Sequence, residues 1–160
     1  MPNLNYDIYT QVRGFSRRDN ADPTKSITLL NNSGSDIRYG TFVMGDVGTR
    51  TMSAMDGSTE AKPIGYMPTE YTYEENYNSD GNVALANNNY GDAFKEGTFE
   101  VYSVSAVNSG DSVYVVNDPS SPDNGLVRAS ANGNAILLEN CRFEDTTSEP
   151  GYVSIALNLP

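Results

Sequence analysis

The chain has 160 residues and a formal net charge of −11, with 21 acidic side chains, ten basic side chains and no histidine. The acidic balance argues against a nucleic-acid-binding protein, because phosphate neutralisation requires clustered lysine and arginine. Without histidine, the chain also lacks the usual general base of serine and cysteine hydrolases.

The N-terminal region, residues 1–25, is predicted to be an arm. Its apolar residues alternate too weakly to indicate a strand, and it is slightly basic while the rest of the chain is strongly acidic. This asymmetry is typical of a tail that binds a partner. A solvated lead-in packed along the edge of the domain fits the pattern equally well. The candidate partner contacts in the arm are Arg13, Phe15, Arg17 and Arg18.

Residues 26–160 are predicted to form a single all-β domain, either a small β-barrel or a β-sandwich. Short runs rich in β-branched and aromatic residues are separated by turn signals at roughly 8 to 12 residue spacing, which favours these folds over a helical one. Apolar residues alternate most clearly at the C-terminus, in residues 152–159. The expected strands before residue 70 are 27–30, 37–44, 49–55 and 61–67.

Residues 70–96 are interpreted as an acidic loop insertion. Six acidic side chains stand against Lys95 alone in this segment. We expect loops around a short strand at 82–86, and a helix over 69–77 is an alternative that its tyrosine, threonine and asparagine disfavour. Tyrosine is favoured at contact surfaces but is also an ordinary sheet residue. The candidate partner-facing tyrosines are Tyr71, Tyr73, Tyr77 and Tyr90.

No cofactor or metal site is predicted. Asn76–Asn82 imitates the first half of a calcium-binding EF-hand loop, with oxygen-bearing side chains at alternate positions and glycine at the sixth. The twelfth position is Asn87, where that loop requires a bidentate glutamate, so we favour an acidic surface loop. Cys141 lies in a strand-like run and is predicted to be a buried free thiol, packing as a small hydrophobic side chain.

Two hairpins are predicted in the C-terminal half. The first is 98–117, where flanks rich in valine and tyrosine surround the turn residues Asn108–Asp111. Both flanks are apolar on both faces, which indicates a central or covered position in the sheet. The second hairpin pairs 126–129 with 135–138, across an Asn-Gly turn.

A weak internal repeat relates residues 39–44 to residues 109–114, and in each segment a glycine opens a strand. Strands preceded by glycine resemble one another by chance, so the match alone does not establish a duplication. A real repeat would mean two similar β units that share one core, because a solenoid needs at least three repeats.

The order of these segments resembles that of the capsid decoration, or cement, proteins of tailed bacteriophages. The resemblance rests on order and spacing from residue 26 to the end, whereas residues 1–22 and 70–96 match no part of the pattern. The segments that carry it are Ile27–Gly34, Ile37–Val43, Pro63–Tyr66, Gly97–Val101, Ser109–Val115 and Val153–Pro160.

The resemblance implies a non-enzymatic virion protein, made in the bacterial host cytoplasm, that binds the outer capsid surface and bridges neighbouring major capsid subunits. It also implies self-association, with a homotrimer favoured over a dimer. No nucleic-acid partner is expected because of the acidic charge, and no membrane partner is expected because no apolar run approaches the roughly 20 residues needed to span a bilayer. The alternative is a receptor- or glycan-binding head of a phage fibre or spike, suggested by the tyrosine- and asparagine-rich loops. A glycosidase with paired carboxylates is less favoured, because no acidic pair stands out and tryptophan is absent.

Overall fold

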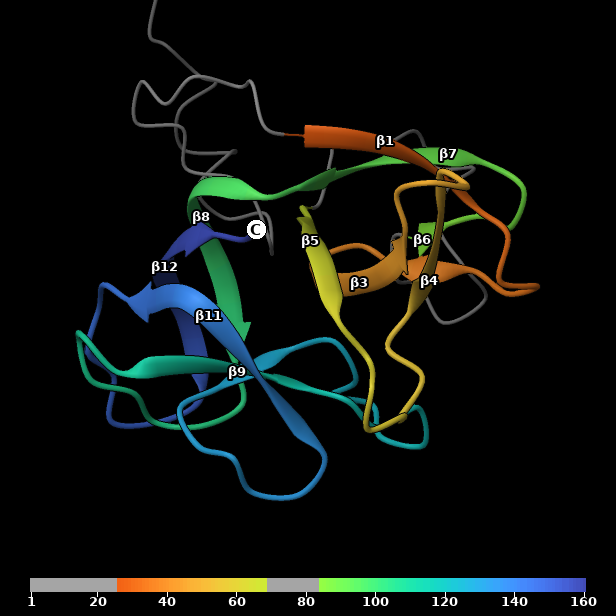
Figure 1. Ribbon diagram of the computed structural model, residues 1–160. Coiled ribbons are helices and arrows are strands. Elements are labelled where there is room, and N and C mark those ends of the chain that lie inside the picture. The colour runs from red at the N-terminus through yellow and green to blue at the C-terminus, as the bar shows by residue number, and fades with distance from the viewer. Residues whose placement is uncertain (1–25, 69–83) are drawn as a thin grey trace, which may run out of the picture.

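The computed structural model describes residues 26–68 and 84–160, and this part of the chain contains twelve β-strands and no helix (Figure 1). The all-β prediction is therefore confirmed. Accordingly, no helix in these residues could cross a membrane. The strands are β1 (Ser26–Asn31), β2 (Ile37–Arg38), β3 (Thr41–Asp46), β4 (Thr51–Ala54), β5 (Pro63–Met67), β6 (Ala84–Leu85), β7 (Tyr90–Phe94), β8 (Glu96–Ser103), β9 (Ser112–Val116), β10 (Val127–Arg128), β11 (Ala135–Phe143) and β12 (Gly151–Asn158).

The strands close into two five-stranded barrels that lie side by side (Figure 1). The N-terminal barrel has the strand order β1-β4-β3-β5-β7, and the C-terminal barrel has the order β10-β8-β12-β11-β9. β2 and β6 form a separate two-stranded sheet. Only Lys95 separates β7 from β8, so the last strand of one barrel leads directly into the first strand of the other. Closure of both sheets pairs the strand edges that would otherwise invite aggregation.

The two barrels share one pairing scheme. In each, the first strand pairs in parallel with the third and antiparallel with the fifth. The second strand pairs antiparallel with the third and the fourth, and the fourth pairs antiparallel with the fifth. The weak sequence repeat, residues 39–44 and 109–114, overlaps the second strand of each barrel, β3 and β9. The structure therefore contains two similar β units, as the repeat would require.

A fully buried polar side chain ends the first strand of each barrel. Asn31 and Ser103 are both 0% exposed. The Asn31 amide donates to the carbonyl oxygens of Ser35 and Leu85 at 2.8 and 3.1 Å, and the Ser103 hydroxyl donates to the Ser105 carbonyl oxygen at 2.9 Å. Because a buried polar group is destabilising unless it is hydrogen-bonded, these contacts fix where the chain leaves each barrel.

Both predicted hairpins are wrong. β8 and β9, which contain the flanks of the predicted 98–117 hairpin, are not neighbours, because β10 lies between them. β10 and β11 are likewise separated by β9. The turn Asn108–Asp111 does form, and the Asp111 amide donates to the Asn108 carbonyl oxygen at 3.0 Å. A turn sequence thus sets a local reversal of the chain, whereas closure of the barrel decides which strands become neighbours.

The described part of the predicted acidic loop contains β6, which lies within the short strand expected at 82–86, and the unexpected strand β7. β7 pairs with β1 along its whole length, from Tyr90 opposite Leu30 to Phe94 opposite Ser26. Its sequence, Tyr-Gly-Asp-Ala-Phe, contains no β-branched residue, and its glycine and aspartate disfavour strands, so the sequence pattern does not predict it. Residues 69–83 of the segment lie outside the described residues.

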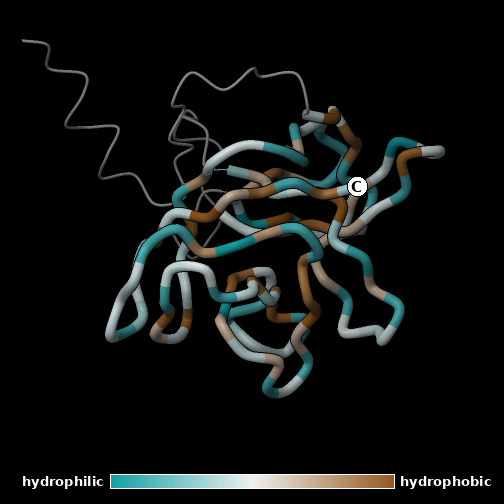
Figure 2. Tube along the Cα trace, turned by 60° about the vertical axis from the view of Figure 1, so that its left-hand side comes forward, coloured by the Kyte–Doolittle hydropathy of each residue, from teal (hydrophilic) through white to brown (hydrophobic). Residues whose placement is uncertain are grey.

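Each barrel has an apolar interior, and aromatic rings join the two. The rings of Phe42 and Tyr66 have centroids 5.1 Å apart, and Tyr66 lies 5.5 Å from Phe99 of the C-terminal barrel. Figure 2 shows many of the hydrophobic residues in the inner part of the trace, with mostly hydrophilic or neutral residues in the outer loops. The N-terminal barrel is filled by Leu29, Ile37, Val43, Met52, Met67, Leu85 and Ala93. The cluster around the C-terminal barrel also includes Phe42 and Tyr66 from the other barrel, and Met55 and Ala61 from the loop between β4 and β5.

Polar contacts from the loop between β9 and β10 reinforce the junction of the barrels. The Asn117 side chain is 2% exposed, accepts a hydrogen bond from the Gly57 amide at 2.7 Å and donates to the Ser58 carbonyl oxygen at 2.8 Å. The Phe42 amide donates to the Gly125 carbonyl oxygen at 2.9 Å. These bonds satisfy backbone groups of the N-terminal half with atoms of the C-terminal half, so the barrels form one packed body.

Candidate interaction surfaces

Most of the residues predicted to contact a partner lie outside the described residues. These are Arg13, Phe15, Arg17 and Arg18 of the arm, and Tyr71, Tyr73 and Tyr77 of the acidic segment. The EF-hand-like residues 76–82 also lie there. Their roles as capsid-contacting or partner-facing residues stay predictions. The remaining candidate, Tyr90, is described.

Tyr90 opens β7 and is 68% exposed. Strand alternation explains its position, because Ala93 faces the interior at 0% exposure while Tyr90 and Asp92 project from the other face. On this outer face Tyr90 lies opposite Leu30, and the Thr28 hydroxyl donates to the Asp92 carboxylate at 2.5 Å. The outer surface of β1 and β7 therefore presents a large aromatic side chain beside an ordered polar pair.

In the described part of the chain, two further large apolar side chains are exposed that are not among the predicted contact residues. Val47, in the turn between β3 and β4, is 49% exposed, and Leu137, on β11, is 45% exposed. The sequence does indicate that Val47 is exposed, because this apolar residue lies inside a turn sequence, Gly-Asp-Val-Gly. The sequence does not indicate that Leu137 is exposed, because its neighbours Ile136 and Leu138 are also apolar. Only the structure shows which of the three side chains faces solvent.

Other tyrosines pack along the outside of the C-terminal barrel. Tyr102 on β8 lies directly opposite Tyr152 on β12, and the two rings meet edge to face with centroids 5.1 Å apart. Tyr114 on β9 lies opposite Leu137 on β11. These half-buried rings stabilise cross-strand pairs, which is the ordinary use of tyrosine in a sheet. Tyr90, by contrast, stands largely exposed.

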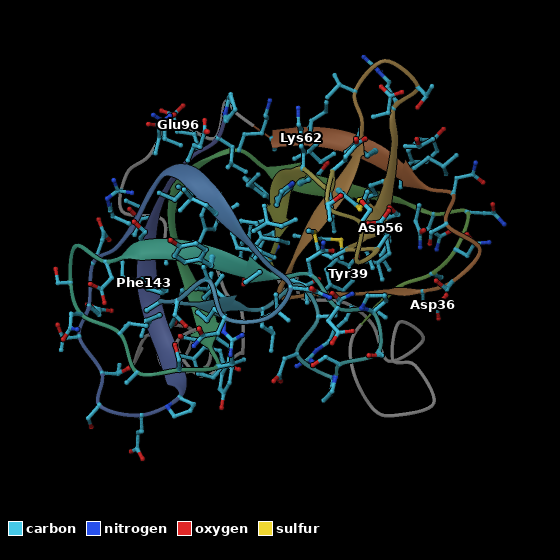
Figure 3. The ribbon with its side chains drawn as sticks, turned by 60° about the horizontal axis from the view of Figure 1, so that its bottom comes forward. Asp36, Tyr39, Asp56, Lys62, Glu96 and Phe143 are labelled. Carbon is cyan, nitrogen blue, oxygen red and sulfur yellow. The ribbon has the colours of Figure 1, made fainter. Side chains whose placement is uncertain are left out.

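Charge divides unequally between the barrels. The described residues 26–68 and 84–95 carry four basic and five acidic side chains, whereas residues 96–160 carry two basic and nine acidic. Figure 3 shows Glu96 pointing outward, while Phe143 lies among the strands of the C-terminal barrel. The N-terminal barrel is therefore nearly neutral in its described part, and the C-terminal barrel is strongly acidic.

The ionisable groups with shifted pKa values in the two barrels serve structural contacts. Cys141 is 0% exposed, which confirms the predicted buried thiol, and burial raises its pKa. The carboxyl pKa of Asp56 is lowered by a hydrogen bond from the Ser58 amide, and that of Asp118 by one from the Ser120 hydroxyl. Both carboxylates close turns. In the described part of the chain, no group of three or more acidic or cysteine side chains could hold a metal ion.

These features define a class of protein: an all-β molecule of two five-stranded barrels that share one pairing scheme, with a core cluster that extends from the C-terminal barrel to Phe42 and Tyr66 of the other. A solved structure contains the same fold. The structure titled "The capsid of Myoviridae Phage XM1" includes a chain that matches with a TM-score of 0.71 and 17% sequence identity, covering 92% of this chain and 89% of that chain. Among curated proteins, none matches the sequence.

Residues 8–158 match the structural cement protein family (E217 gp24/Pam3 gp6), and the chain belongs to this family. It is therefore a structural protein of the phage virion, with a capsid-stabilising role, and the resemblance to capsid cement proteins is confirmed. The match includes most of the arm and all of residues 70–96, which the sequence pattern left unplaced.

Proposed function

We propose that this cement protein binds the outer surface of the capsid and bridges neighbouring major capsid subunits, without catalysing a reaction. The observation that carries the proposal is the family match over residues 8–158. The joined barrels support it, because a body whose halves are linked by a common core cluster and by hydrogen bonds can hold two attachment points at a fixed distance. Many such copies on one shell resist expansion together, even where each contact is weak.

We further propose that the arm and the N-terminal barrel face the shell. The arm leads directly into β1, so both belong to one end of the chain. Interface cores are depleted of charge and enriched in aromatic residues, which suits the nearly neutral barrel that carries Tyr90. The acidic C-terminal barrel would have to desolvate more charge on binding, which favours its exposure to solvent.

Self-association as a homotrimer, with a dimer as the alternative, completes the proposal. The high negative charge of the C-terminal barrel disfavours contacts between two such barrels. We therefore expect copies to meet through their N-terminal barrels or arms. The mass of the purified protein in solution, measured by light scattering at low and high salt, distinguishes monomer, dimer and trimer.

Deletion of residues 2–22 is expected to abolish binding to expanded capsids while leaving the barrels folded. The reason is that the deletion removes three of the ten basic side chains together with Phe15, and removes no described strand. The measurement is cosedimentation of the purified protein with empty expanded heads, with the bound copies counted by gel densitometry. Thermal unfolding of the deletion variant reports on the fold.

A matched variant separates charge from length in this experiment. Replacing Arg13, Arg17 and Arg18 with glutamine keeps the arm at full length, and it should weaken binding and reduce its dependence on salt. Unchanged capsid occupancy after the deletion, with the fold intact, would contradict the proposal. Binding to a glycan array by protein that does not bind capsids would instead support the receptor-binding alternative.

The orientation of the barrels gives a separate prediction. Tyr90→Ser should weaken capsid binding about tenfold or more, because a large aromatic contact at an interface contributes roughly 1–2 kcal/mol or more. Leu137→Ser, which also removes an exposed apolar side chain but from the C-terminal barrel, should change binding by less than about twofold. Titrations of empty heads with each variant measure the two affinities. The reverse order of effects would place the C-terminal barrel against the shell.

A further inference from the structure

The sequence contains two asparagines that are followed by glycine, Asn124 and Asn132, and the fold treats them differently. We propose that Asn132 is a site of spontaneous deamidation in the folded protein, while the fold protects Asn124. The inference rests on the geometry of the two turns and does not depend on the proposed function.

Deamidation at such a sequence requires no enzyme or cofactor. The glycine amide nitrogen loses its proton and attacks the Cγ atom of the asparagine, so that a new N–Cγ bond forms as the Cγ–Nδ2 bond breaks. The Nδ2 group takes up a proton and leaves as ammonia. Water then opens the resulting succinimide ring at either carbonyl carbon, which yields aspartate or isoaspartate. Glycine favours ring closure because it has no Cβ atom to hinder the attack.

The groups that react at Asn132 are unrestrained. Asn132 and Gly133 are both exposed, in the turn between β10 and β11. Among the described residues, neither the Asn132 side chain nor the Gly133 amide has a hydrogen-bond partner. The neighbouring Arg128 binds only the backbone, since its Nη1 atom donates to the Asn132 carbonyl oxygen at 2.7 Å. A Cβ atom placed on Gly133 would meet nothing closer than Arg128 Nη1, at 4.0 Å.

At Asn124 the side-chain amide and the following glycine amide both form hydrogen bonds. Its Oδ1 atom accepts from the Asp118 amide at 2.9 Å, and its Nδ2 atom donates to the Met55 carbonyl oxygen at 2.8 Å. The Gly125 amide, which would be the nucleophile, donates to the Val116 carbonyl oxygen at 2.8 Å. Attack on Cγ therefore requires these bonds to open, and the bond to Met55 is part of the junction between the barrels.

Reaction at Asn132 changes the charge and the length of one turn. The neutral amide becomes a carboxylate beside Arg128, which adds one negative charge to a barrel that is already acidic. The isoaspartate product also adds a methylene group to the main chain of the turn. The β11 strand begins only at Ala135, so the change falls outside the paired strands.

The test is incubation of the purified full-length protein in heavy-oxygen water at mildly alkaline pH, followed by peptide mapping with mass spectrometry. Hydrolysis of the succinimide incorporates the heavy isotope, so sample handling does not contribute to the signal. We expect Asn132 to react roughly tenfold faster than Asn124 or more, because three hydrogen bonds must open at Asn124. In denaturant the two rates should converge to within about threefold, because the same hydrogen bonds are then lost at both sites.

Two variants complete the experiment. Asn132→Gln should lose the modification of this turn, because its longer side chain closes the corresponding ring far more slowly. Asn117→Ala removes the two side-chain hydrogen bonds that link the loop between β9 and β10 to Gly57 and Ser58. It should raise the deamidation rate at Asn124 without changing that at Asn132. Equal rates at the two asparagines in the folded protein would overturn the proposal. So would an unmodified Asn132, or a rate difference that persists in denaturant.

Discussion

Replacing Tyr66 with alanine is expected to lower the free energy of unfolding by about 3–5 kcal/mol, the range for removing a large aromatic side chain from a core. Tyr66 is 1% exposed and lies between Phe42 and Phe99, at centroid distances of 5.1 and 5.5 Å. Its loss leaves a cavity at the junction of the barrels, where neither closed sheet can collapse to fill it. Urea unfolding at neutral pH measures the change.

Tyr66→Phe is the matched control, because it keeps the ring and removes only the hydroxyl. That hydroxyl donates to the Glu100 carbonyl oxygen at 3.3 Å, so its removal should lower stability by about 1 kcal/mol. If alanine were no worse than phenylalanine, packing between the barrels would contribute little to stability. The wild-type protein should also unfold in a single transition, because the larger core cluster includes residues from both barrels and Tyr66 packs between them.

The Tyr66 hydroxyl should also make the free energy of unfolding depend on pH. Burial, with smaller contributions from Tyr152 and Glu100, raises the pKa of Tyr66 well above its usual value of 10.0. As the pH approaches and passes the usual tyrosine pKa, Tyr66 loses its proton in the unfolded chain but keeps it in the folded chain. The folded state therefore becomes less stable as the pH rises. Tyr66→Phe lacks this pH dependence, and its deficit relative to wild type should shrink between pH 8 and pH 11. A deficit that stays constant would mean that the phenol ionises normally in the fold.

Side-chain alternation in the sequence predicted individual strands well. In residues 152–159 the alternating apolar positions Val153, Ile155 and Leu157 are all buried in β12, as expected from the period-two pattern. The glycine-led repeat also pointed to the second strand of each barrel. These features depend on local chemistry, on which the sequence carries direct information. The N-terminal arm and residues 69–83 lie outside the described residues, so their predicted roles stay predictions.

Which strands become neighbours was not accessible from the sequence. The turn sequence in residues 98–117 predicts a hairpin, yet β10, which follows later in the chain, pairs between β8 and β9. β10 has only two residues, Val127 and Arg128, so no periodic pattern could reveal it. The exposure of Leu137 could not be predicted for a related reason. Three consecutive apolar residues do not show which side chain faces solvent. Partner choice depends on closing the barrel, which involves residues distant in sequence.

Gly125→Ala is expected to destabilise the protein by about 2–5 kcal/mol, from a backbone term and a packing term. The φ angle of Gly125 is 81°, in the left-handed region that a residue with a Cβ atom disfavours. A Cβ atom at this position would lie 2.8 Å from Thr41 Cβ and 3.1 Å from the Phe42 carbonyl oxygen. Thr41 and Phe42 belong to β3, so the added atom would push the loop between β9 and β10 away from the N-terminal barrel.

Two other glycines separate the backbone contribution from the packing contribution. Gly110 has a φ angle of 91° but open space around its Cβ position, so Gly110→Ala should lower stability by only about 1–2 kcal/mol, the backbone term alone. Gly151 has neither a positive φ angle nor a close neighbour, and Gly151→Ala should change stability by less than about 0.5 kcal/mol. Urea unfolding of the three variants ranks the effects. If Gly125→Ala lost no more stability than Gly110→Ala, the loop would have room to move, and its hydrogen bonds rather than close packing would hold the two barrels together.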